Sequence, residues 1–287
     1  MANLKELRKR IQSVSSTMQI TSAMKMVSAA KLKKAQDSIL QMRPYASKLK
    51  EILQNLNSTL EGNDGIYASK KEVKNVLLVA MTSNRGLCGA FNSNINKLAR
   101  KTAEEQKSLG RHVSILCVGK KAYDYFKKLE YTIAGNESHI FDQIQYSKVE
   151  TLAENLMADF RNGKYDEIHL IYNQFKNAAV QYPTVEQYLP VQKPENQNSA
   201  ATDYIYEPEK ADLLQLLIPK SLKIQVYKAV LDSNASEHGA RMTAMHKATD
   251  NARELQRVLK LDYNKARQAS ITNEILEIVS GAAALNG

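Results

Sequence analysis

Apolar residues recur alternately three and four positions apart near both ends of the chain. The first repeat contains Leu4, Leu7, Ile11, Val14 and Met18 and resumes at Leu32, Ala35, Ile39, Met42, Ala46, Leu49, Leu53, Leu56 and Leu60. This spacing is typical of a coiled-coil seam rather than of a globular core. We predict one helix from Asn3 to Leu60, about 85 Å long at the standard rise. Such a helix must extend beyond any domain of this size.

The first repeat falters in its middle, where Thr21, Lys25 and Ser28 occupy seam positions. Apolar residues of the same stretch lie on other faces of the helix: Ile20, Met24, Met26, Val27, Ala29 and Ala30. A helix that is apolar nearly all round is expected to be contacted on several sides. Pro44 removes a backbone donor, so we expect a bend near that residue.

The second repeat predicts a long C-terminal helix, and Pro219 marks either a kink in it or its true start. Its seam is expected at Met242, Met245, Ala248, Ala252, Leu255 and Leu259, followed by Ile271, Ile275, Ile278, Ala282 and Leu285. The final turns, from Val279 to Leu285, carry no charge. An uncharged helix tip requires an apolar socket or becomes an aggregation liability. The two terminal helices can wind together into a shaft.

Between the two repeats, short apolar runs alternate with helical stretches. Strands are predicted at Val76–Met81, Val113–Val118, Glu167–Tyr172, Tyr182–Val191 and Tyr204–Tyr206. Helices are predicted at Asn94–Leu109, Ala122–Leu129 and Val149–Phe160. This alternation predicts a largely parallel, Rossmann-like sheet that is covered on both faces. The fold class is therefore α/β, with terminal helices at 1–60 and 209–287 around a central domain at 73–208.

The positive charge is concentrated at the N-terminal end. Residues 1–50 contain 11 Lys or Arg against Glu6 and Asp37, which accounts for +9 of the total of +10. Nucleic acid, anionic lipid and an acidic protein surface are all possible partners for such a stripe. Tyr45 is the only aromatic residue of this segment, which favours a solvated face or a protein partner over nucleic acid.

The chain has no apolar run long enough for a membrane span and no apolar secretory signal at its start. We therefore expect an intracellular protein without direct membrane insertion. Cys88 and Cys117 are the only cysteines, so reduced structural thiols are expected rather than disulfides.

The loop after the first central strand, Ser83–Asn92, lies where many α/β proteins bind phosphate. It contains no Gly-x-Gly-x-x-Gly and no Gly-Lys-Ser or Gly-Lys-Thr, so Gly86 and Gly89 are interpreted as turn residues. No pattern supplies a base for Cys88, and the five histidines lack metal-ligand spacing. We predict a chain without a catalytic site, metal or cofactor.

Three stretches carry a resemblance to the γ subunit of F-type ATP synthases of the bacterial type. They are ITSAMKMVSAAKL at 20–32, SNRGLCGAFN at 83–92, and NKARQASITNEI at 264–275 followed by EIVSGAAA at 277–284. The resemblance covers essentially the whole chain. It implies a central rotor stalk in which the terminal helices form an antiparallel coiled coil inside a ring of alternating α and β subunits.

The resemblance also implies partners and contacts. The partners are the α and β subunits, the ε subunit and the membrane c ring, at the cytoplasmic face of the bacterial membrane. Contacts with the β subunits are expected at Met24, Lys25, Arg241, Arg267 and Gln268. An apolar bearing tip is expected at Ile271, Ile275, Ile278, Val279, Ala282 and Leu285. Contacts with the c ring are expected at Tyr204, Tyr206 and Glu207.

Each expectation has a simpler alternative. The β-facing residues are otherwise solvated helix residues, and Tyr204–Tyr206 is otherwise an ordinary edge strand. The main functional alternative is a coiled-coil adaptor that binds nucleic acid through its basic helix, and a dinucleotide-dependent enzyme is a third possibility.

Overall fold

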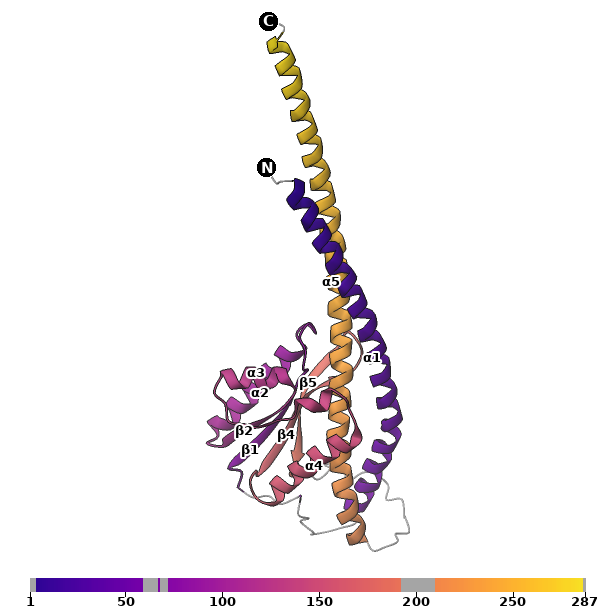
Figure 1. Cartoon of the computed structure of the whole chain (residues 1–287). Coiled ribbons are helices and arrows are strands. Elements are labelled where there is room, and N and C mark those ends of the chain that lie inside the picture. The colour runs from indigo at the N-terminus through magenta and orange to yellow at the C-terminus, as the bar shows by residue number, and fades with distance from the viewer. Residues whose placement is uncertain (1–3, 59–66, 68–71, 192–209, 286–287) are drawn as a thin grey trace. The chain divides into compact units, whose positions relative to one another are not determined.

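A computed structural model describes residues 4–58, 67, 72–191 and 210–285 (Figure 1). The chain divides into two compact units. Residues 29–241 form the sheet unit, and residues 1–28 together with 242–287 form the helix-pair unit. Helix α1 (Leu4–Ser58) and helix α5 (Lys210–Leu285) contribute to both units. The predicted boundaries at 1–60, 73–208 and 209–287 follow the secondary structure instead and stay predictions.

The sheet unit contains one five-stranded sheet in the order β3-β2-β1-β4-β5. Its strands are β1 (Asn75–Met81), β2 (His112–Val118), β3 (Ile133–Asn136), β4 (Glu167–Phe175) and β5 (Gln181–Leu189). The first four strands are parallel, and β5 runs antiparallel to β4. The predicted largely parallel, Rossmann-like sheet is thus confirmed. Central strand β1 is buried from Val76 to Met81, as expected for a strand covered on both faces.

Helices cover both faces of this sheet (Figure 1). One core layer lies between the sheet and helices α2 (Phe91–Ser108) and α3 (Lys120–Lys128). The other contains α4 (Tyr146–Arg161) and part of α5, with Leu222, Val226 and Val230 buried. A short 3-10 helix, η1 (Ser138–Phe141), follows β3. Part of α5 therefore belongs to the core of the sheet unit.

Most predicted elements are present with shifted ends, and a few predictions fail. The sequence pattern missed β3, which has only one large apolar residue, Ile133. Pro219 lies inside α5, so it is not the start of that helix. Helix α1 continues through Pro44, and the bend expected near that residue stays a prediction. The predicted strand at Tyr204–Tyr206 lies outside the described residues.

In the helix-pair unit, the seam of α1 does not break at its polar positions. Thr21 and Ser28 are buried and Lys25 is half-buried, so the three-and-four spacing continues through them. A hydrogen bond of 2.8 Å joins the hydroxyl of Thr249 on α5 to that of Thr21. The nearby Lys25 Nζ donates to His246 Nδ1 over 3.3 Å. Polar pairs therefore replace apolar contacts within a continuous seam.

The α5 seam differs from the predicted one. Met245, Ala252 and Leu259 are buried as expected, but Leu255 is 49% exposed. The half-buried position belongs to the adjacent Gln256. The prediction at Leu255 was wrong because it chose the seam position by apolarity alone. The three-and-four spacing of the helix instead places Gln256 on the inner face.

The seam of α5 ends well before the helix does. The antiparallel register set by Thr21–Thr249 and Lys25–His246 places Leu7 opposite Tyr263 and Leu4 opposite Ala266. Burial agrees with this register, because Ser270 is half-buried and every residue from Ile271 to Ala282 is exposed. The last turns of α5 thus have no α1 residue opposite them.

Candidate functional site: the loop after β1 and its contact with α5

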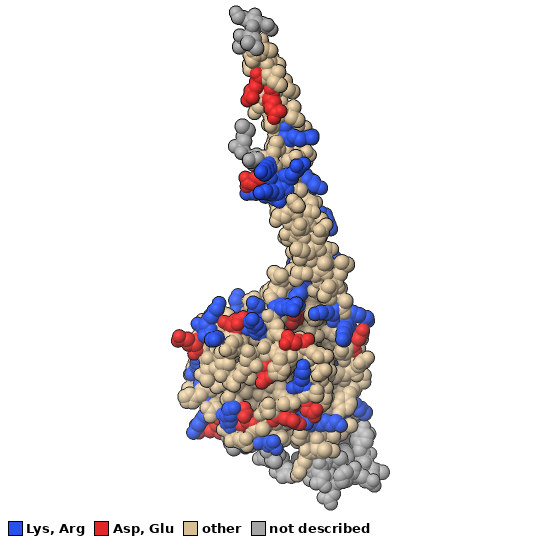
Figure 2. All heavy atoms as spheres, viewed as in Figure 1, with Lys and Arg blue, Asp and Glu red and all other residues tan. Residues whose placement is uncertain are grey.

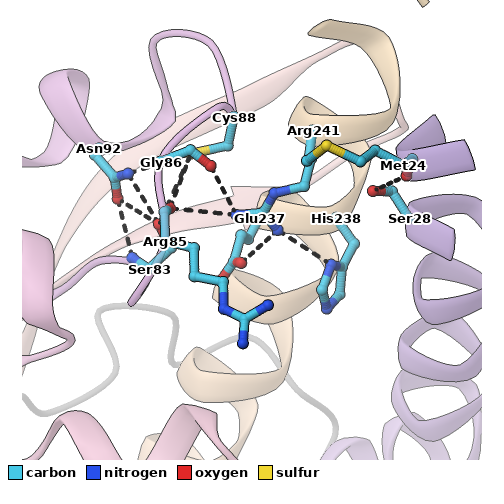
Figure 3. Close-up of polar contacts among 10 residues, drawn as sticks. All are labelled: Met24, Ser28, Ser83, Arg85, Gly86, Cys88, Asn92, Glu237, His238 and Arg241. Atoms are coloured by element: carbon cyan, nitrogen blue, oxygen red, sulfur yellow. Dashed lines mark hydrogen bonds and ion pairs between the residues drawn. The ribbon is translucent and has the colours of Figure 1, made fainter. Parts of the chain in front are cut away.

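The loop that joins β1 to α2 is fixed by a short-range polar network (Figure 3). The backbone N–H of Ser83 donates to Asn92 Oδ1 over 2.9 Å, and the Ser83 hydroxyl donates to the carbonyl of Arg85 over 2.6 Å. Asn92 Nδ2 donates in turn to Ser83 Oγ and to Cys88 Sγ, at 2.9 and 3.2 Å. The first turn of α2 is thereby tied to the last residues after β1.

Asn84 anchors the same loop on its other side. Its Nδ2 donates to the carbonyl of Ser138 over 2.9 Å and to Asp142 Oδ1 over 3.0 Å, both from the segment that contains η1. Its Oδ1 accepts from the backbone N–H of Lys120 at the start of α3. The loop is therefore held against two neighbouring connections of the sheet as well as against α2.

The tip of this loop combines an unusual backbone with an exposed apolar side chain. Leu87 has a φ of 63°, in the left-handed region that non-glycine residues rarely adopt, and Gly89 has a φ of 60°. The Leu87 side chain is 65% exposed. Backbone strain of this kind persists only where the surroundings impose it and is common at functional sites. The network around Ser83, Asn84 and Asn92 supplies that constraint.

Arg241 of α5 binds the loop from the opposite side (Figure 3). Its Nη2 donates to the carbonyls of Arg85 and Gly86, at 3.3 and 3.4 Å. Its Nη1 lies 2.6 Å from Glu237 Oε1, one helical turn earlier. Arg241 is only 8% exposed. Its guanidinium thus connects two successive loop carbonyls to a carboxylate on α5.

The electrostatics around Arg241 follow from burial. Burial raises the pKa of Glu237, and the opposing effect of Arg241 is smaller. Burial, together with the smaller effect of the cations of Arg241 and Lys31, lowers the pKa of His238 to about 4. His238 is therefore neutral near pH 7, and its Nδ1 accepts from Arg241 over 3.5 Å. The cluster contains one buried ion pair beside a neutral imidazole.

Cys88 is not an activated nucleophile in this setting. Burial raises the pKa of its thiol, although the hydrogen bond from Ser83 and the charge of Arg241 lower it in part. Among the described residues, no group of three or more His, Cys, Asp or Glu side chains is arranged to hold a metal ion. The arrangement is suited to holding and presenting a loop.

The structure places the other predicted contact residues in different environments. Met24 and Lys25 are half-buried, and Arg267 and Gln268 are exposed. The predicted bearing residues Ile271, Ile275, Ile278, Val279 and Ala282 are all exposed, whereas the side chain of Leu285 lies outside the described part. Tyr204, Tyr206 and Glu207, the predicted c-ring contacts, also lie outside the described residues.

Arg241 was predicted as a contact with β subunits, but its guanidinium is engaged within the chain itself. Sequence reasoning did not identify Glu237, Ser83 or Asn92 as its supporting residues. The spacing of Glu237 and Arg241, four apart on a helix, was an available signal for an ion pair. No sequence signal links Arg241 to Arg85, which lies 156 residues away.

The architecture and this site define a class of protein: a chain that combines a unit of two paired long helices with a unit built on a Rossmann-like sheet. A family model described as ATP synthase matches residues 3–285. The ATP synthase gamma chain of Flavobacterium johnsoniae is 61% identical over 289 aligned residues, and that of Christiangramia forsetii is 59% identical over 288. Both alignments cover 100% of each chain. The chain therefore belongs to the family of ATP synthase gamma chains.

Solved structures agree with this assignment. A chain from the central stalk and c ring of Tetrahymena thermophila mitochondrial ATP synthase is 26% identical, with a TM-score of 0.59. The match covers 80% of this chain and 99% of that one. A rotor chain of the Euglena gracilis mitochondrial enzyme, 21% identical with a TM-score of 0.66, shares the fold over 93% of this chain and 98% of its own.

Proposed function

We propose that this chain is the central rotor stalk of a bacterial F-type ATP synthase. In this role it couples ion-driven rotation of the membrane c ring to ATP synthesis or hydrolysis at the catalytic β subunits. Its partners are the α and β subunits, the ε subunit and the c ring. The family assignment supports the role, and one structural observation carries it: α5 continues past the end of its seam as an exposed, apolar helix.

The exposed end of α5 requires a surrounding partner. Ile278 is 71% exposed, and Ile271, Ile275, Leu276 and Val279 are also exposed, so apolar side chains point outward on several faces. A solvent-facing helix normally confines such residues to one stripe. A ring of subunits that encloses the tip would remove all of these faces from water at once.

Nucleotide chemistry is assigned to the partner subunits. The loop after β1 occupies the usual phosphate-binding position of an α/β sheet, but its backbone is engaged by Ser83, Asn92 and Arg241. We assign this chain no catalytic site and no cofactor. Its contribution to catalysis is mechanical, because an asymmetric shaft that contacts each β subunit differently changes the relative free energies of their conformations.

The proposed contacts with β subunits fall into two groups. Four residues have side chains that are at least partly accessible for direct contact: Met24, Lys25, Arg267 and Gln268. Arg241 acts through the loop that it holds, which presents exposed Arg85 and Leu87. The proposed c-ring contact at Tyr204, Tyr206 and Glu207 rests on the resemblance alone.

The basic first helix fits an acidic partner surface. Within residues 1–50 the two acidic residues are already paired inside α1, as Glu6 with Arg10 and Asp37 with Lys33, both at 3.0 Å. Elsewhere in the chain, Lys and Arg alternate with Asp and Glu on the face shown in Figure 2. Exposed charge attraction is screened and weak, which permits sliding contact without locking.

We assign the chain to the cytoplasmic face of the cell membrane, as a peripheral component of a membrane-associated complex. Among the described helices, none combines the length and apolarity that a membrane crossing requires. Attachment is therefore proposed to occur through the c ring. The comparisons offer no support for the nucleic-acid alternative.

Co-expression tests this function. An affinity-tagged chain produced with the α, β and ε subunits should copurify with them in a complex that hydrolyses ATP. A matched chain shortened to end at Ser270 removes the exposed apolar turns but keeps the seam. We expect the shortened chain to assemble less stably and to rotate with weaker coupling. Failure of the full chain to associate with α and β would refute the proposal.

A further inference from the structure

The sheet unit contains a half-open cavity of about 530 Å³ between α1, α5 and the β4–β5 hairpin. Its volume lies within the range of about 300–1,000 Å³ found for small-molecule sites. Its walls include four charged side chains, Arg43, Glu186, Lys228 and Asp232, and four apolar ones, Ile39, Met42, Phe175 and Ile224. The proposed rotor function uses none of these residues.

Asp232 is the deepest charged group of this cavity. It is only 5% exposed, and within the described part of the chain its carboxylate makes no hydrogen bond and no ion pair. Glu186 differs, because Tyr172 Oη donates to it over 2.6 Å and Gln225 Nε2 over 2.8 Å. A buried carboxylate without a donor is costly. Asp232 therefore presents an unused acceptor to the cavity.

Two basic residues that line the cavity are more exposed than Asp232. Arg43 is exposed and Lys228 is half-buried, and neither forms an ion pair among the described residues. Both lie close enough to Asp232 to lower its pKa, but burial outweighs them and raises that pKa to about 6. The cavity lining thus combines one carboxylate without a hydrogen-bond donor, two basic groups without an ion pair and several apolar side chains.

We propose that this cavity binds a small zwitterion, in which an ammonium group and a carboxylate are joined by a short aliphatic chain. The ammonium donates to Asp232, the carboxylate accepts from Arg43 and Lys228, and the methylenes pack against Ile39 and Ile224. An amine alone leaves both bases unpaired, and a carboxylic acid alone leaves Asp232 unpaired. The proposal goes beyond the rotor function and does not depend on it.

Calorimetric titration of the full chain with three matched probes tests this binding. The probes are 6-aminohexanoate, hexylammonium and hexanoate, which share a chain length and differ in their charged ends. We expect 6-aminohexanoate to bind about tenfold more tightly than hexylammonium or hexanoate. Each of these two probes lacks one charged end and therefore one charge-assisted hydrogen bond. Its affinity should increase as the pH rises through about 6, where Asp232 loses its proton.

Variants identify the site. Asp232→Asn and Lys228→Met should each weaken binding of 6-aminohexanoate about tenfold, while Asp262→Asn and Lys97→Met, exposed residues outside the cavity, should not. Thermal unfolding of each variant checks its folding, and two separate variants protect the test if one misfolds. Equal binding of the three probes, no saturable binding, or equal losses in the controls would overturn the proposal.

Discussion

The Glu237 carboxylate lies 2.6 Å from the Arg241 guanidinium, and both side chains are about nine-tenths buried. Removal of one partner from such a pair is costly, because it leaves the other charge buried without compensation. We predict that Glu237→Ala lowers the free energy of unfolding by about 3 kcal/mol, measured by urea denaturation. The double variant Glu237→Leu with Arg241→Met should recover most of this loss. If the losses of unfolding free energy in the single variants Glu237→Leu and Arg241→Met add up to the loss in the double variant, the two residues are not coupled.

The strained backbone at Leu87 gives a prediction of the opposite sign. Leu87→Gly should stabilise the isolated chain by up to about 1 kcal/mol, because glycine adopts a positive φ without steric cost. Glu130, with a φ of 55°, is a matched control, and Glu130→Gly should stabilise the chain similarly. In the assembled complex only Leu87→Gly should weaken association with α and β subunits. Equal effects on assembly would remove Leu87 from the interface.

Two titratable groups of the sheet unit are predicted to act on stability in opposite directions. Folding raises the pKa of Asp232 from 3.8 to about 6. The stabilisation by the protonated side chain is therefore complete below pH 3.8 and is lost as the pH rises through about 6. Asp232→Asn should remove up to about 3 kcal/mol of this pH dependence, measured as unfolding free energy between pH 4 and pH 7.

His238 has the reverse sign. Folding lowers the pKa of His238 from 6.5 to about 4. The stabilisation by the neutral imidazole is therefore complete above pH 6.5 and is lost as the pH falls toward 4. His238→Gln should therefore flatten the acid side of the stability profile by up to about 3 kcal/mol, less any screening by water. A variant profile that parallels the original would show that His238 is not buried in its neutral form.

Arg267 and Gln268 are exposed and free for contact with a partner. Replacement of both with Ala should lower coupled ATP turnover about fivefold or more while assembly stays intact, since truncation of an interfacial arginine commonly costs over about 1 kcal/mol. Lys97→Ala with Lys101→Ala on α2 is the control pair. Loss of assembly instead would give Arg267 and Gln268 a structural role.

Hydrogen exchange should report the end of the seam. In the isolated chain, amides after Ser270 should exchange fast, because no α1 residue lies opposite them. The helix-pair unit should be less protected than the part of α5 that is buried in the sheet unit. Addition of α and β subunits should slow exchange at Ile271–Val279 most. Strong protection of these turns in the lone chain would contradict the need for a surrounding ring.

Strands β1 and β4 were predictable from their apolar runs, and helix α4 was predictable from the helical spacing of its apolar residues. Strand β3 was not, since three of its four residues are small or polar and its pairing with β2 alone defines it. The seam of α1 was predicted from its apolar members, but only the structure shows that Thr21 and Ser28 complete it. Polar residues at such positions are indistinguishable from surface residues until the partner helix is known.

The candidate site was predictable only in part. The Ser83–Asn92 stretch was identified by resemblance, and the absence of a phosphate-binding pattern in it followed directly from its residues. The contact of Arg241 with the carbonyls of Arg85 and Gly86 depends on how a distant helix crosses the end of the sheet. Every residue has a backbone carbonyl, so the residue type at the accepting position does not reveal that a side chain binds there.

The bare end of α5 also has a consequence for the cell that makes this chain. The turns from Ile278 to Ala282 are exposed and carry no charge, so this end of the helix is prone to aggregation until partner subunits enclose it. Copies produced in excess of their ring would associate with one another or be degraded. Balanced synthesis of the subunits is thus a requirement set by the same helix tip that allows the finished machine to turn.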